Sequence, residues 1–193
     1  MKKSLILALL LVGCATPVTQ AHKADPKQVE EVRGVAKALM TQLGGKLKGE
    51  IAANGPEAAI GVCKISAPQI AADLSIQTGW KVSRVGTRAR NAVSGTPDAW
   101  NAKALAAFAE RMKQGEKPDA MEMSEVVTEP SGQTYLRYAK AIAIQPMCLA
   151  CHGSSTDIPD GVKVRLQSEY PLDKATGYSV GELRGAVVVM RPL

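Results

Sequence analysis

Apolar residues recur at helical spacing through the first half of the chain. In residues 27–51 they fall every three or four positions, which predicts a long first helix. An Asn-Gly-Pro triplet at residues 54–56 ends this helix and opens a second one, because Pro fits the first turn of a helix. Pro68 is expected to kink or restart the second helix, with Ser66 as its cap. The second helix carries an apolar face made of Ile60, Cys63, Ala67, Ile70 and Leu74.

Four other segments have the alternating pattern or the β-branched composition of strands. A Glu-Pro-Ser-Gly turn at residues 129–132 joins two of them into a hairpin. Between the first strand and this hairpin, the Ala-rich residues 99–112 predict a third helix. The predicted strands are residues 80–88, 121–128, 133–144 and 185–190. The order of helices and strands predicts an α+β domain.

Composition narrows the class of protein further. The 193 residues are 46% hydrophobic, which is enough to build the core of one domain. Lys and Arg number 24 against 18 for Asp and Glu, a formal net charge of +6, and aromatic residues make up only 4%. Because no basic run exceeds two residues, the chain has neither the charge stripe nor the stacking platforms of a nucleic-acid binder. No apolar stretch approaches the roughly 20 residues that span a bilayer, which excludes a transporter or channel.

The N-terminus has the pattern of an export signal. Lys2 and Lys3 precede a short apolar run, and Leu-Val-Gly-Cys at residues 11–14 resembles a bacterial lipobox. In such a signal the Cys14 thiol receives a lipid and the preceding peptide is removed, so residues 1–13 are expected to be a lipoprotein signal peptide. The alternative is an ordinary secretory signal cut after Ala21.

Both N-terminal alternatives place the domain outside the cytoplasm. A lipid anchor would hold it on a membrane surface at the periplasmic side of the cell envelope. Ala15 after Cys14 resembles lipoproteins sorted to the outer membrane more than those kept at the inner membrane. Residues 14–26 are expected to be a tether, because they are polar and punctuated by Pro, and residues 27–193 to be the functional domain.

The candidate chemistry is concentrated in residues 148–152, which read Cys-Leu-Ala-Cys-His. This Cys-x-x-Cys-His pattern is the signature of c-type haem attachment. Two thiols with two residues between them lie on one helical turn and reach the two vinyl groups of a porphyrin. The adjacent imidazole of His152 can then bind the iron. Chance matches to the pattern are rare in a chain with four Cys and two His. The sequence therefore predicts one covalent haem on Cys148 and Cys151.

Three other uses of the motif fit less well. A disulfide across two residues is strained, and a zinc site lacks a fourth ligand. A redox-active Cys pair has no need of the following His. Export favours haem over all three, because c-type cytochromes mature outside the cytoplasm.

The motif and several other segments resemble the Tll0287-like haem-binding domains. The resemblance covers roughly residues 27–193, and the segments that carry it are residues 90–91, 96–100, 146–153, 170–171, 173–178 and 181–186. It implies a PAS-like fold, with a central antiparallel sheet, a long N-terminal helix and flanking helices, and one covalent haem. The chain departs from the family pattern at Ala92, where Pro is common, and at Asn101, where an acidic residue is common. Neither position is an iron ligand.

The second axial ligand remains open from the residues alone. His22 lies on the tether, and each Met is more often core filler than ligand. Cys63 is a spare thiol and reads equally as a small buried hydrophobe. The resemblance favours Cys63, because the segment around it is similar to the one that supplies a Cys as distal ligand in the family. The Met candidates are Met40, Met112, Met121, Met123, Met147 and Met190.

Arginines near the first strand are candidates for binding the haem propionates. On an extended strand Arg84, Arg88 and Arg90 would share one face, and Arg suits bidentate pairing with carboxylates. The alternative is a solvated face. Trp100 and Tyr138 either pack on the porphyrin or fill the core.

Two functions fit these features, and neither is enzymatic. One is a periplasmic sensor module whose haem changes redox state or binds CO or NO and which signals through a partner. The other is a carrier of single electrons to a redox partner protein. A haem enzyme would need a distal acid–base group beside an open iron site, and His22 cannot serve from a tether.

Overall fold

The computed structural model describes residues 24–193, so Cys14, Ala15, Ala21 and His22 lie outside the described residues. Its centre is an antiparallel sheet with the strand order β1-β4-β3-β2. The strands are β1 (Lys81–Gly86), β2 (Glu122–Thr128), β3 (Thr134–Ala143) and β4 (Leu183–Pro192). The predicted hairpin is confirmed, with Thr128 paired to Thr134 across the turn. The predicted α+β class and PAS-like arrangement of sheet and helices are also confirmed.

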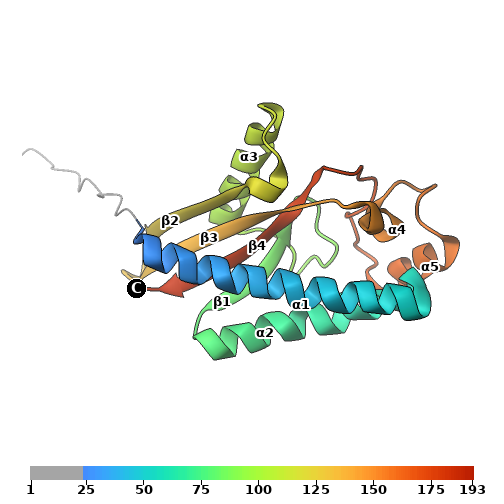
Figure 1. Cartoon of the computed structure of the whole chain (residues 1–193), viewed down its shortest axis with the longest axis horizontal. Coiled ribbons are helices and arrows are strands. Elements are labelled where there is room, and N and C mark those ends of the chain that lie inside the picture. The colour runs from blue at the N-terminus through green and yellow to red at the C-terminus, as the bar shows by residue number, and fades with distance from the viewer. Residues whose placement is uncertain (1–23) are drawn as a thin grey trace, which may run out of the picture.

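One face of the sheet is covered by α1 (Pro26–Ala58) and α2 (Ala67–Thr78), which lie side by side (Figure 1). Asp25 caps α1 by accepting a hydrogen bond from the Lys27 amide at 2.9 Å. The buried residues of this layer come from both helices and from alternate positions of the strands. They are Val32, Ala36, Leu39, Leu43, Ala67, Ile70, Leu74, Val82, Leu136, Tyr138, Val187 and Val189.

The path from α1 to α2 differs in detail from the expectation. The predicted break at residues 54–56 is confirmed, because Gly55 has φ +81° and interrupts the helix. A π-helical turn, η1 (Val62–Ser66), then leads into α2. Ser66 is wrong as a predicted cap, because its backbone is helical and its side chain makes no capping hydrogen bond. Pro68 is tolerated because it lies in the first turn of α2.

The opposite face of the sheet is covered by α3 (Ala99–Lys113), as Figure 1 shows. Asp98 caps this helix by accepting from the Asn101 amide at 2.8 Å. A second cluster of buried residues joins α3 to the sheet. Trp100 belongs to this cluster and Tyr138 to the first one, so both fill the core and neither lines the cavity described below.

Three helices lie at the end of the sheet where α1 finishes: η3 (Pro146–Cys148), α4 (Leu149–His152) and α5 (Asp160–Glu169) (Figure 1). A short turn, η2 (Pro118–Ala120), instead lies between α3 and β2 and contacts β3. The sequence did not predict α5, in which only Val162 and Leu166 are buried. Among residues 24–193, no helix combines the length and apolar character needed to cross a membrane.

Candidate functional site

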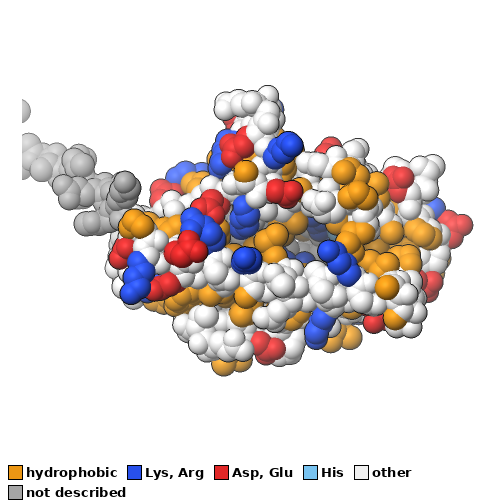
Figure 2. Space-filling view, viewed as in Figure 1, with side chains coloured by type: hydrophobic (Ala, Val, Ile, Leu, Met, Phe, Trp, Pro, Cys, Tyr) orange, Lys and Arg blue, Asp and Glu red, His pale blue; other side chains and the backbone are white. Residues whose placement is uncertain are grey.

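A cavity lies between α1, η1 and the sheet, and α4 closes one side of it. Its volume is about 350 Å³, and it opens to solvent. Typical small-molecule pockets enclose roughly 300–1,000 Å³, so the cavity is large enough for a small-molecule ligand. Figure 2 shows a hollow above α1, bordered by hydrophobic side chains and by Lys or Arg side chains. Most of the lining is apolar, including Leu39, Leu43, Leu47, Ile51, Ile60, Ile142 and Ile144.

The Cys-x-x-Cys-His motif forms one wall of this cavity. Residues 146–152 fold into η3 and α4, which puts Cys148 and Cys151 about one helical turn apart. Cys148 and Cys151 are half-buried and unbonded to each other. Burial raises the pKa of the Cys151 thiol to about 11, so it is protonated at neutral pH. Both residues line the cavity.

Gly153 ends the motif in a position that has no room for a side chain. A Cβ there would lie 2.6 Å from Asp157 Cβ and 2.7 Å from the Leu149 carbonyl oxygen. Asp157 in turn accepts hydrogen bonds from Ser154, at 2.8 Å from its amide and 2.6 Å from its hydroxyl. The turn after His152 is thus tightly folded, which fixes where the histidine leaves the backbone.

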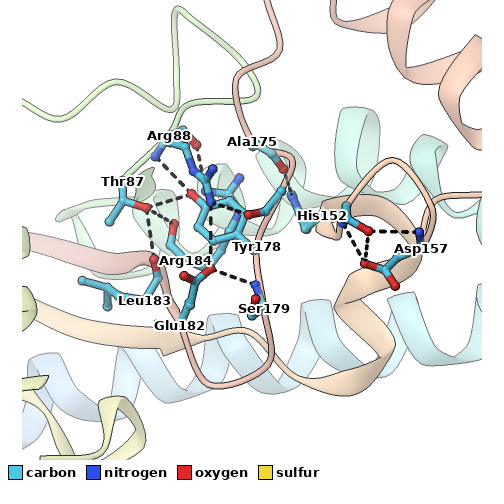
Figure 3. A network of polar contacts seen from close by, with 12 residues as sticks. Thr87, Arg88, His152, Asp157, Ala175, Tyr178, Ser179, Glu182, Leu183 and Arg184 are labelled. Carbon is cyan, nitrogen blue, oxygen red and sulfur yellow. Dashed lines mark hydrogen bonds and ion pairs between the residues drawn. The ribbon is translucent and has the colours of Figure 1, made fainter.

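The His152 ring is held from one side. Nδ1 lies 2.6 Å from the carbonyl oxygen of Ala175, and since a carbonyl only accepts, Nδ1 carries the proton (Figure 3). Nε2 therefore keeps its lone pair. The ring also meets Tyr178 edge-on, with centroids 6.2 Å apart and planes at 88°. Burial, with Arg90 and Arg184 nearby, holds the pKa of His152 well below its ordinary value, so the ring is neutral. Neutral imidazole is the form that binds metals.

The loop at residues 173–178 carries this acceptor, and the sequence did not assign it a role. Gly177 and Tyr178 donate their amides to the carbonyls of Gly153 and His152, at 2.6 Å and 2.9 Å. Because Ala175 contributes only a backbone carbonyl, no side-chain pattern marks it. The resemblance of residues 173–178 to the family was the one sequence signal that pointed to this loop.

The three predicted arginines do not share one strand face, because β1 ends at Gly86. Arg84 lies on the strand and lines the cavity. Arg88 lies beyond the strand, with its guanidinium 3.6 Å from the centre of the Tyr178 ring (Figure 3), and does not line the cavity. Arg90 lines the cavity and is paired with Asp173 at 2.9 Å. The sequence missed Arg184, which also lines the cavity.

The structure brings Cys63 into the same cavity as the motif. It lies on η1 and is half-buried. Met40 and Met147 line the cavity as well, whereas Met112, Met121, Met123 and Met190 do not. Within residues 24–193, no three His, Cys, Asp or Glu side chains gather as the ligands of a metal ion would. The zinc alternative therefore lacks a ligand set in this part of the chain.

A PAS-like α+β domain with a Cys-x-x-Cys-His turn on the wall of an apolar cavity has the architecture of a domain that encloses a prosthetic group. The chain belongs to the Tll0287-like family, which it matches over residues 16–192. It is similar in structure to the cyanobacterial heme-protein Tll0287, whose crystal structure is known, with a TM-score of 0.66 and 26% sequence identity. That similarity covers 88% of this chain and 97% of the other. No curated protein sequence matches the chain.

Proposed function

We propose that this chain is a c-type cytochrome with one haem, bound through thioethers at Cys148 and Cys151 and through His152 as axial ligand. The observation that carries the proposal is the Nδ1 hydrogen bond to Ala175, which leaves the Nε2 lone pair of His152 free to bind a metal, beside two thiols that form no disulfide. A ligating His commonly donates its other ring N–H to a carbonyl in this way. Haem iron supplies one-electron redox chemistry and an axial position for a further ligand. Membership of the family that includes the heme-protein Tll0287 supports the same assignment.

The charges in the cavity fit haem as well. Within residues 24–193, neither Arg84 nor Arg184 has a carboxylate at ion-pair distance. Burial lowers the pKa of both guanidinium groups, which is the cost of enclosing a positive charge without a carboxylate to pair with it. Haem carries two propionates, and Arg binds carboxylates well. We assign Arg84 and Arg184 to the propionates in preference to Arg88, which does not line the cavity, and Arg90, which is paired with Asp173.

Cys63 is the distal axial ligand in this proposal. It faces the cavity from η1, and the family resemblance of its segment favours it over Met40 and Met147. A thiolate stabilises ferric iron, so the reduction potential should lie well below that of a His/Met cytochrome. Release of Cys63 on reduction would free a position for CO or NO, giving the two states that a redox or ligand sensor needs.

The second candidate function is transfer of single electrons to a partner. The opening of the cavity to solvent favours it, because an exposed haem edge allows electrons to pass between proteins. Fast self-exchange with an unchanged axial ligand set in both redox states would support the carrier, and ligand exchange on reduction would support the sensor. Neither role requires catalysis by the protein.

The location of the protein is part of the proposal. The Leu-Val-Gly-Cys sequence supports a lipid on Cys14, which would place the domain on the periplasmic side of the cell envelope, at the outer membrane more than the inner. Mass spectrometry of the mature N-terminus tests this directly. An acylated Cys14 supports the anchor, and a free amine at His22 would establish cleavage after Ala21 instead.

Acid–acetone extraction of the purified protein tests the haem assignment. The haem should stay with the protein and give a c-type pyridine haemochrome. Replacing Cys148 and Cys151 by Ser should release it to the solvent, whereas Cys63→Ser should leave it attached. Cys63→Ser should also remove the thiolate charge-transfer features and raise the potential. Complete extraction of haem from the wild-type protein would refute covalent attachment, and an unchanged spectrum in Cys63→Ser would make that thiol core filler.

A further inference from the structure

Arg90 reaches the same backbone carbonyl that holds His152. Its Nη2 donates to the Ala175 carbonyl oxygen at 3.2 Å and to the Cys151 carbonyl oxygen at 2.5 Å. His152 Nδ1 donates to that Ala175 oxygen at 2.6 Å. The Ala175 carbonyl therefore accepts two hydrogen bonds, one from the proposed axial ligand and one from a cationic side chain.

Asp173 fixes the guanidinium in this position. One of its carboxylate oxygens accepts from Arg90 Nε at 2.9 Å and the other from the Ala175 amide at 2.7 Å. The two side chains are 8% and 10% exposed, so the pair is held away from water. The guanidinium is thereby fixed by Nε on Asp173 and by Nη2 on two backbone carbonyls.

We infer that Arg90 is a positioning residue that sets the donor strength of His152 and thereby the reduction potential of the haem. The inference rests on the proposed function, because it needs His152 to bind iron. It also gives Arg90 a role different from the propionate contact that the sequence suggested. Arg90 holds the Cys151 backbone and the Ala175 carbonyl together, so it joins the attachment motif to the loop that orients the histidine.

The sign of the effect follows from the shared acceptor. A hydrogen bond from a cation withdraws electron density from the Ala175 oxygen, which makes that oxygen a weaker acceptor for His152 Nδ1–H. The ring then keeps its proton more tightly and donates less density through Nε2. A weaker donor stabilises ferric iron less, so Arg90 should raise the potential. The positive charge of Arg90 acts in the same direction.

Two substitutions separate the hydrogen bond from the charge. Arg90→Lys keeps the charge and can still pair with Asp173, but an ammonium group lacks the planar fork that reaches two carbonyls. Arg90→Met removes both contributions. We expect the reduction equilibrium to shift toward the ferric state by about tenfold in Arg90→Met, which is about 59 mV for a one-electron couple. Arg90→Lys should shift it in the same direction by about threefold.

Arg137 offers a matched control. It is 7% exposed, compared with 8% for Arg90, and it pairs with Asp98 at 2.5 Å and with Asn101 at 3.2 Å. It lies against Trp100 in the cluster on the α3 side of the sheet. Arg137→Lys and Arg137→Met therefore disturb a buried Arg–Asp pair of the same kind without touching His152.

The experiment measures midpoint potential, attached haem and the electron paramagnetic resonance g values of the oxidised holoprotein, which report axial donor strength. The inference is supported if both Arg90 variants lower the potential and move the g values while both Arg137 variants leave them unchanged. Equal effects of Arg90 and Arg137 variants, or no change at Arg90 with haem attached, would overturn it. Loss of haem from both Arg90 variants, with haem retained in both Arg137 variants, would also overturn it, because Arg90 would then act on haem attachment. Absence of haem from the wild-type protein would instead refute the proposed function.

Discussion

Tyr178 joins His152 to the end of β1. The edge of its ring meets the His152 ring, and its hydroxyl lies 2.8 Å from Thr87 Oγ1 (Figure 3). The same hydroxyl accepts a hydrogen bond from the Arg88 amide at 3.2 Å. The chain just after the strand is thus bound to the ring that borders the proposed iron ligand.

Tyr178→Phe should therefore lower the stability of the fold without changing the haem site. The variant keeps the ring edge against His152 but leaves the Arg88 amide without its acceptor, so unfolding should become easier by about 0.5–1.5 kcal/mol. Chemical denaturation measures this change, and the haem spectrum should stay the same. Tyr135→Phe on β3 is the control, because the Tyr135 hydroxyl makes no hydrogen bond to another side chain or to the backbone within residues 24–193. A changed spectrum in Tyr178→Phe would show that the hydroxyl acts on the iron site.

Arg84→Met should lower the reduction potential with the haem still attached. The substitution removes a positive charge from the cavity wall, and a haem that has lost a nearby cation favours the ferric state. Arg84→Lys should keep most of the wild-type potential. Arg88→Met should have little effect, since Arg88 does not line the cavity. Potentiometric titration of the four proteins makes the comparison, and equal shifts at Arg84 and Arg88 would contradict the propionate assignment.

Gly153→Ala should destabilise the turn after His152. The added methyl meets Asp157 and the Leu149 carbonyl at distances that force the turn to move, and such overpacking costs about 1–3 kcal/mol. The yield of protein with attached haem should fall with it. Gly34→Ala is the opposite case, because Gly34 lies within α1 with no atom within 4 Å of the new methyl. It should stabilise the fold by about 0.4–1 kcal/mol. Thermal unfolding distinguishes the two directions.

Acid should weaken the contact between α1 and the hairpin through Glu122. This carboxylate accepts from Arg33 Nε at 2.9 Å and from the Tyr138 hydroxyl at 2.7 Å, and chiefly the Arg33 hydrogen bond lowers its pKa from the ordinary 4.5 to about 2. Because the folded pKa is the lower one, the stabilisation is complete above about pH 4.5 and is lost as the pH falls to about 2. Glu122→Gln should flatten the dependence of unfolding free energy on pH in that range, and an unchanged slope would contradict it.

The parts of the fold that the sequence predicted are those with strong local patterns. The hairpin combines alternation with a Pro-Ser-Gly turn, and the first helix has buried residues at regular spacing. Helix α5 has its apolar residues Val162, Val164 and Leu166 at alternate positions, and Val164 is exposed, so its sequence lacks helical spacing. Residues 87 and 88 continue the alternating pattern, so the sequence predicted a strand that runs past its observed end at Gly86. The Gly86 amide donates to the Gly95 carbonyl, a loop contact that no pattern of side chains encodes.

The site was predictable where it depends on side chains with distinctive chemistry. The motif at residues 148–152 and the spare Cys63 were found because their residue types are rare, and the structure brings them to one cavity. The arginines were harder to assign, because Arg is a common residue type and the directions of these side chains depend on where β1 ends. The role of the Ala175 carbonyl could not be predicted from the sequence. Any residue at that position would present the same backbone carbonyl, and only the fold brings it to His152.

The strand order has a consequence for the time at which the cavity can form during synthesis. Of the four strands, β4 is the last in sequence, yet it lies inside the sheet and pairs with both β1 and β3. Until residues 183–192 emerge, β1 has no partner strand and the hairpin is half paired. The thiols at residues 148 and 151 precede β4 in the chain, so they are exposed on an incomplete fold before their cavity closes around them.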